Sequence, residues 1–128
     1  MNIEELREDG RLSSYILDKR VGIHVKHSAS RLHPWQFTFT QANILQISML
    51  KERCATVFIV LVCHSDGMVA ITFEEINQML ETGRSDQAWV RVDRQKNKCY
   101  SVTGGLAELG GKRPQGLIQI IHALDASR

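Results

Sequence analysis

The sequence has few cysteines, and none of them stand at the spacing of a metal or redox site. Its three cysteines, Cys54, Cys63 and Cys99, are odd in number and form no CxxC motif. Disulfide-rich domains and zinc ribbons use larger sets of cysteines at short, fixed spacings. Cys63 also closes an apolar stretch, where a thiol packs as a small hydrophobic group. We therefore expect reduced, buried thiols, as in cytosolic proteins.

Long apolar runs are also missing. No stretch approaches the roughly 18 apolar residues that a membrane-spanning helix needs. The chain begins with the acidic segment 1–5 instead of a basic leader before an apolar run. We therefore expect a cytoplasmic protein that is neither exported nor associated with a membrane.

Motifs of common hydrolases and nucleotide-binding proteins are absent as well. No serine lies in a GxSxG elbow, and no cysteine can be assigned a histidine base. The glycine-rich stretch 104–114 contains Gly111-Lys112, but Arg113-Pro114 follows where a Walker loop requires serine or threonine. We therefore expect neither nucleotide binding nor hydrolysis of that type, and a flexible loop is the simpler interpretation.

The residues that are present suffice for one hydrophobic core. Hydrophobic residues make up 43% of the 128 positions and charged residues 23%, as in an ordinary globular protein. A chain of this length can bury one core but not two. We therefore predict a single domain over residues 1–128.

The first half of the chain shows a sequence of helix and strand patterns. Trp35, Phe37 and Phe39 alternate as in a strand packed on a core, and Thr40 is a suitable helix N-cap. The apolar, β-branched run 55–63 is typical of a strand covered on both faces in the middle of a sheet. The predicted ranges are a helix over 2–9, strands over 12–18, 21–28 and 35–39, a helix over 41–53 and a strand over 55–63.

The second half predicts further strands and helices. Asp66-Gly67 indicates a turn before a strand over 68–71, and Thr72 with Glu75 forms a capping-box pattern that opens a short helix to about residue 80. Runs 88–94 and 99–103 predict a hairpin, whereas the type of the element at 115–125 stays open. The whole predicts an α/β (α+β) fold, a mixed sheet with flanking helices and a C-terminal β-hairpin.

The predicted order of the first six elements resembles the α-β-β-β-α-β core of the restriction-endonuclease-like superfamily, the PD-(D/E)xK nucleases. In that family an acid and an acid-x-Lys motif bind magnesium and orient the attacking water, so the resemblance implies metal binding by Asp18 and catalysis by Asp18 and Lys26. His24 stands in place of the second carboxylate, and imidazole is a poor magnesium ligand. The resemblance therefore implies a non-catalytic member that requires no cofactor. The alternative is an active nuclease that uses magnesium or manganese, with Glu4 or Glu8 as the second acid.

Segments 21–28, 32–39, 89–92 and 100–104 also look like bacterial proteins that carry no assigned activity. This second resemblance implies a bacterial, cytosolic origin. It implies nothing about a substrate or a ligand.

Two groups of residues are candidates for binding. His24 and Lys26 share a strand face and are followed in the next loop by Arg31 and His33, so these side chains could converge on an anion. The alternative is the solvated face of a hairpin, with Lys26 protecting the edge of a sheet.

The second group lies on the predicted C-terminal hairpin. Trp89 shares its face with Arg91, which favours an exposed ring that could stack on nucleic-acid bases. Between Arg84 and Arg113 there are seven basic and three acidic residues. The basic candidates on and around the hairpin tip are Arg91, Arg94, Lys96 and Lys98. A basic hairpin of this kind could bind phosphates or acidic protein, although such a surface can also be merely solvated.

These patterns predict a binding domain more readily than an enzyme. The partner is nucleic acid or another protein, and a homo-oligomeric scaffold is a further alternative.

Overall fold

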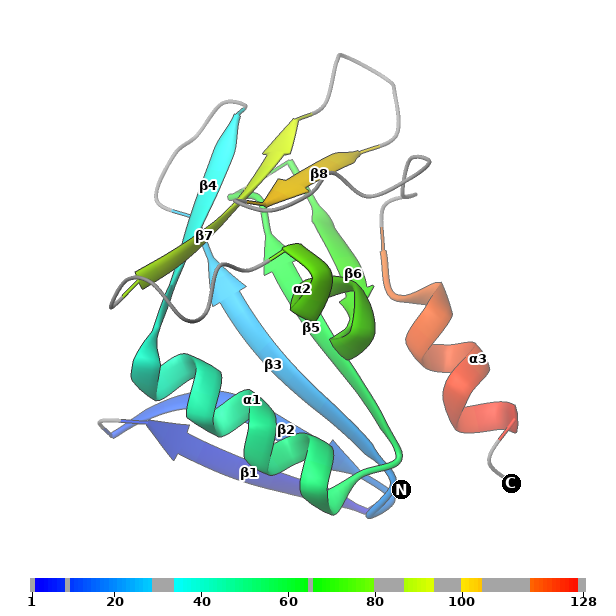
Figure 1. Cartoon of the computed structure of the whole chain (residues 1–128). Coiled ribbons are helices and arrows are strands. Elements are labelled where there is room, and N and C mark those ends of the chain that lie inside the picture. The colour runs from blue at the N-terminus through cyan, green and yellow to red at the C-terminus, as the bar shows by residue number, and fades with distance from the viewer. Residues whose placement is uncertain are drawn as a thin grey trace.

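A computed structural model of the chain describes residues 2–8, 10–28, 34–64, 66–79, 87–93, 100–104 and 116–126. The described residues form eight strands and three helices (Figure 1). In chain order they are β1 (Ile3–Glu8), β2 (Arg11–Leu17), β3 (Val21–His27), β4 (Trp35–Thr40), α1 (Gln41–Arg53), β5 (Thr56–Val62), β6 (Met68–Thr72), α2 (Phe73–Met79), β7 (Gln87–Asp93), β8 (Ser101–Gly104) and α3 (Ile118–Ala126). The predicted α+β class with a mixed sheet is confirmed.

The larger sheet has five strands in the order β1-β2-β3-β5-β6. β3 and β5 are parallel, and the other neighbouring pairs are antiparallel. The apolar run predicted to be central forms β5, an interior strand, while β3 occupies the middle of the order. The segment that carries His24 and Lys26 pairs with this apolar run, with His24 opposite Ile59 and Lys26 opposite Leu61.

The helix predicted over 2–9 is wrong, because residues 3–8 form β1. β1 pairs along its whole length with β2, from Ile3 opposite Leu17 to Glu8 opposite Arg11. A helix of eight residues has a costly nucleus and little stability alone, whereas the hairpin gains a ladder of backbone hydrogen bonds. Gly10, with φ of 79°, adopts the left-handed turn conformation that connects the two strands. The described order thus begins β-β-β-β-α-β, which differs at its first element from the order that suggested a nuclease core.

The smaller sheet, β4-β7-β8, is antiparallel and packs on one part of the larger sheet. The aromatic strand is confirmed as β4, and its three rings are buried. The inner face of this sheet and the adjoining strands β5 and β6 share one apolar core. Its buried members are Trp35, Phe37, Phe39, Ile47, Ile59, Leu61, Cys63, Val69, Ile71, Ile76, Met79, Val90, Val92, Tyr100 and Val102.

Helix α1 covers the remaining part of the same face of the larger sheet (Figure 1). The predicted helix and its cap are confirmed: Asn43 N–H donates to Thr40 Oγ1 at 3.1 Å, and Thr40 N–H donates to Asn43 Oδ1 at 3.0 Å. Gly22 of β3 lets the helix approach closely, because a Cβ there would lie 3.3 Å from Leu50 Cβ and 3.4 Å from Cys54 Sγ.

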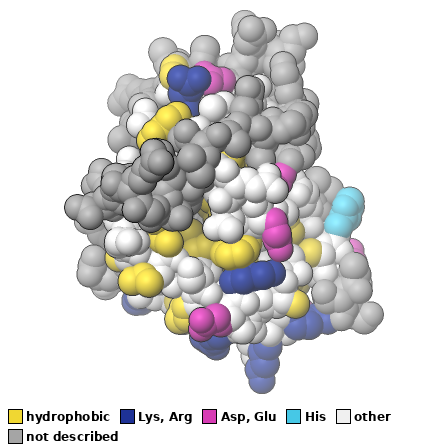
Figure 2. All heavy atoms as spheres, in the orientation of Figure 1, with side chains coloured by type: hydrophobic (Ala, Val, Ile, Leu, Met, Phe, Trp, Pro, Cys, Tyr) yellow, Lys and Arg dark blue, Asp and Glu magenta, His cyan; other side chains and the backbone are white. Residues whose placement is uncertain are grey.

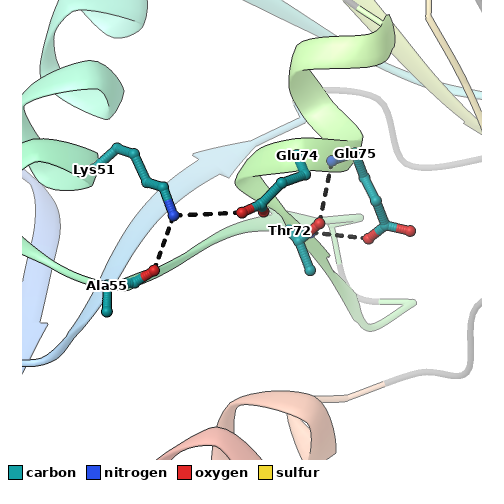
Figure 3. Close-up of polar contacts among 5 residues, drawn as sticks. All are labelled: Lys51, Ala55, Thr72, Glu74 and Glu75. Carbon is teal, nitrogen blue, oxygen red and sulfur yellow. Dashed lines mark hydrogen bonds and ion pairs between the residues drawn. The ribbon is translucent and has the colours of Figure 1, made fainter.

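The predicted capping box of α2 is also confirmed (Figure 3). Glu75 N–H donates to Thr72 Oγ1 at 3.1 Å, and Thr72 N–H donates to Glu75 Oε1 at 3.0 Å. Lys51, near the end of α1, donates to Ala55 O at 2.8 Å and lies 3.3 Å from Glu74 Oε1. These contacts link the end of α1 to the start of β5 and to α2.

Helix α3 settles the element whose type was left open. It packs on the opposite face of the larger sheet, where Ile120 and Leu124 join a second apolar core with Val21, Phe58 and Val60. None of the helices in the described ranges is long and apolar enough to cross a membrane.

Candidate functional site

The polar face of β3 is covered, and its histidine is completely buried. His24 is 0% exposed beneath α1, and Ser14 of β2, opposite it in the sheet, is equally buried. Ser14 Oγ lies 2.9 Å from His24 Nδ1 and donates to Gln46 Oε1 of α1 at 2.7 Å. The alternative that this face is a solvated hairpin surface is therefore wrong at His24, because α1 shields it from water.

Burial and the charge of Lys26 keep the imidazole of His24 neutral. Burial, reinforced by the nearby charge of Lys26, lowers the pKa of His24 to about 4. The imidazole contacts Ser14 Oγ through its Nδ1 atom, at 2.9 Å. Within the described ranges Nε2 has no hydrogen-bond partner. This arrangement is a buried structural network between the sheet and α1.

Lys26 takes part in the same contact between the sheet and α1. Its Nζ donates to Asn43 Oδ1 at 2.9 Å and lies 5.5 Å from the centre of the Phe39 ring. The ammonium group therefore anchors the start of α1 and stacks on an aromatic face. These two contacts hold the start of α1 against the sheet.

The structure does not bring Asp18 and Lys26 together. Asp18 lies in the turn before β3, with φ of 50°, and its carboxylate accepts a hydrogen bond from Asn2 N at 2.9 Å. Lys26 lies near the other end of β3, and the strand between Val21 and Lys26 alone spans about 17 Å. One magnesium ion with its bound water cannot contact both side chains across that distance.

Of the two carboxylates considered as second acids, Glu4 is held away from Lys26 by another partner. Glu4 forms a bidentate ion pair with Arg53 of α1, with Arg53 Nη1 2.8 Å from Oε2 and Nη2 3.0 Å from Oε1. The hydrogen bond from Arg53 lowers the pKa of Glu4. The side chain of Glu8 lies outside the described residues, and the part of the chain that is described holds no group of three His, Cys, Asp or Glu side chains placed to bind a metal ion.

The outer face of the β4-β7-β8 sheet contrasts with the polar face of β3, because it is open. Trp89 and Arg91 point outward from β7, the middle strand. Val90, which lies between them, and Val92, which follows Arg91, are buried. Trp89 is 38% exposed. The predicted sharing of one exposed face by Trp89 and Arg91 is confirmed.

Polar side chains surround these two residues. Trp89 lies opposite Thr38, and Arg91 lies between Gln36 of β4 and Thr103 of β8. Arg91 Nε donates to Asp93 Oδ2 at 3.1 Å on the same face. In Figure 2 a basic, an acidic and a hydrophobic side chain lie together at the top, over the region where Figure 1 shows β4 and β7.

Five predicted binding residues cannot be placed. Arg31 and His33 of the loop before β4, and the hairpin-tip residues Arg94, Lys96 and Lys98, lie outside the described residues. Their predicted role stays a prediction.

Sequence reasoning missed the partners of the β3 face. Ser14, Asn43 and Gln46 all contact it, but none was a candidate. A signal was present, because Asn43 and Gln46 precede Leu50 at spacings of seven and four on one side of α1. Polar residues on the buried side of a helix indicate a polar partner beneath it.

Comparison with known proteins adds no relative on which to base an assignment. The chain matches no protein-family model, no curated protein and no solved structure.

Proposed function

We propose that this protein is a cytoplasmic, non-catalytic domain that binds single-stranded nucleic acid on the outer face of the β4-β7-β8 sheet. The observation that carries the proposal is the position of Trp89, a large aromatic side chain 38% exposed on the middle strand and two residues from an exposed arginine. Because strand residues two apart project from the same face, one ligand can contact both side chains.

The chemistry of this face suits a single strand of bases and phosphates. An exposed indole offers a flat surface on which a base of any sequence can stack, and a neighbouring guanidinium can bind the adjoining phosphate. On the neighbouring strands, Thr38 and Gln36 of β4 and Thr103 of β8 add hydrogen-bond donors and acceptors. Asp93, which pairs with Arg91, opposes phosphate binding, so contact with a phosphate would require Arg91 to exchange this partner.

The first test is a titration of labelled single-stranded DNA and RNA oligonucleotides at low salt, followed by fluorescence anisotropy. We expect binding that weakens steeply with added salt. Trp89→Ala should raise Kd by about 5- to 150-fold, the range of one base stack. Arg91→Gln should lower the slope of log K against log salt by about one.

Matched controls separate this face from general surface effects. Leu45, 69% exposed on α1, provides an apolar control, and Leu45→Ala should leave Kd unchanged. In a Trp35→Phe background Trp89 is the sole tryptophan, and stacking should quench its fluorescence. Absence of binding at low salt, or equal losses for Trp89→Ala and Leu45→Ala, would remove the proposal.

A further inference from the structure

The edge strand β1 lies at the end of the molecule away from the β4-β7-β8 sheet. In the strand order of the larger sheet β1 is terminal, with β2 as its only neighbour among the described strands. Figure 1 shows β1 along the lower margin, away from β4, β7 and β8. An edge strand presents backbone N–H and C=O groups to which another strand can be added.

The backbone groups that face outward belong to the odd-numbered residues of β1. Asp18 N–H donates to Asn2 O at 2.7 Å, so the backbone of Asn2 points toward β2. In an antiparallel pair alternate residues direct their backbone groups to the same neighbour. The even-numbered residues therefore face β2, and Ile3, Glu5 and Arg7 present their N–H and C=O groups at the open edge.

A bulge in the β1–β2 pairing leaves this alternation intact. Leu6 lies opposite Ser14 and Arg7 opposite Leu12, so the extra residue, Ser13, belongs to β2. No extra residue is inserted in β1 itself. Its outer edge is therefore regular over residues 3–7.

We propose that two copies of this chain associate through antiparallel pairing of their β1 edges, with Glu5 of each copy opposite Arg7 of the other. A two-fold axis at Leu6 produces this register and places both Glu5 and Arg7 in pairs whose outward backbone groups can exchange hydrogen bonds. Glu5 and Arg7 are both exposed on one face of β1. Charges of one sign along an edge would repel a second copy, whereas these two charges are opposite and match when the strand is reversed.

The same register shelters an exposed apolar side chain. Ile3 is 57% exposed on the face that also carries Glu5 and Arg7. In the paired edges Ile3 lies diagonal to Arg7 of the second copy, whose aliphatic stem can cover it. Arg7 Nη1 donates to Gly10 O at 3.3 Å in the single chain, a contact that leaves its other donors for the carboxylate of Glu5.

The test is a charge-reversal cycle measured by sedimentation equilibrium over a concentration series at low salt. The wild-type chain should self-associate. Glu5→Arg and Arg7→Glu should each weaken association by roughly tenfold or more. The two-fold axis creates two equivalent pairs between positions 5 and 7, and each single variant places like charges opposite one another in both pairs. The double variant Glu5→Arg/Arg7→Glu should recover the wild-type constant, since the pairs are restored with their signs exchanged.

Circular dichroism of each variant verifies that β1 remains folded. Glu52→Arg is the matched control, because it makes the same charge change at an exposed position of α1 and should not alter association. A wild-type protein that is monomeric at every concentration would overturn the proposal. So would a double variant as weak as the single variants, because it would show that Glu5 and Arg7 do not face each other.

Discussion

β3 and β7 both carry polar side chains at alternate positions, yet the two polar faces meet different surroundings. Under α1, His24 of β3 is fully buried, and its Nδ1 atom contacts Ser14, which donates to Gln46 of α1. On β7 no element of the described ranges covers Trp89 and Arg91, and both side chains are exposed. Alternation therefore shows which side chains share a face, and the packing of other elements decides whether that face is a core or a surface.

The sharpest test of this difference uses the two tryptophans, which lie on opposite faces of the same small sheet. Trp35 is 3% exposed and packs edge-on to Tyr100, with ring centroids 6.2 Å apart. Trp35→Ala should lower the free energy of unfolding by about 3–5 kcal/mol, the usual result of deleting a buried aromatic side chain. Trp89→Ala should lower it by no more than about 1 kcal/mol. Urea unfolding at fixed pH measures both, and similar losses would contradict the assignment of inner and outer faces.

A second test uses the buried histidine and pH. The folded-state pKa of His24, about 4, lies below the value of 6.5 for an unperturbed imidazole. The unfolded chain therefore takes up a proton more readily, so this contribution to stability is complete above pH 6.5 and is lost as the pH falls toward 4. The loss amounts to about 3 kcal/mol at most.

Urea unfolding between pH 7 and pH 4 measures this loss as the slope of the free energy of unfolding against pH. His24→Asn should remove the part of this slope that the histidine contributes. His27, exposed on the same strand, provides the control. His27→Asn should retain the slope. A His24 imidazole that titrates near 6.5 by NMR would show that α1 does not bury it.

The third test compares two glycines at close approaches between elements. A Cβ at Gly104 of β8 would lie 2.5 Å from the carbonyl oxygen of Met79 at the end of α2, and backbone cannot move aside cheaply. Gly104→Ala should therefore destabilise the fold by about 1–3 kcal/mol. Gly22→Ala meets side chains at 3.3 Å and beyond, which can adjust, so its loss should stay below about 1 kcal/mol. Thermal denaturation of both variants measures the two losses of stability. A larger loss for Gly22→Ala than for Gly104→Ala would contradict the packing of β8 on α2.

Several elements were predictable because their signals are local. The alternating rings at Trp35, Phe37 and Phe39, and the capping pair Thr72 and Glu75, depend on neighbours within a few residues. The exposure of Trp89 beside buried Val90 also followed from alternation alone. The candidate site on β7 was therefore accessible to sequence reasoning.

Other features depended on contacts between distant segments. The acidic residues of segment 2–9 are compatible with the first turn of a helix, and only pairing with β2 made it a strand. The cover over His24 required α1, more than fifteen residues further along the chain, to pack on β3. The separation of Asp18 from Lys26 followed from β3 being extended between them.

The sequence by itself determined which residues alternate, where α1 and α2 begin and which strand runs through the apolar interior. The tertiary structure alone decided which polar face is covered, which strand edge stays open and which charged groups can meet. The physical reason is that hydrogen-bonded turns and side-chain alternation are set by adjacent residues. Burial is instead set by whichever distant element covers a face, and the charged state of a group such as His24 follows from that burial.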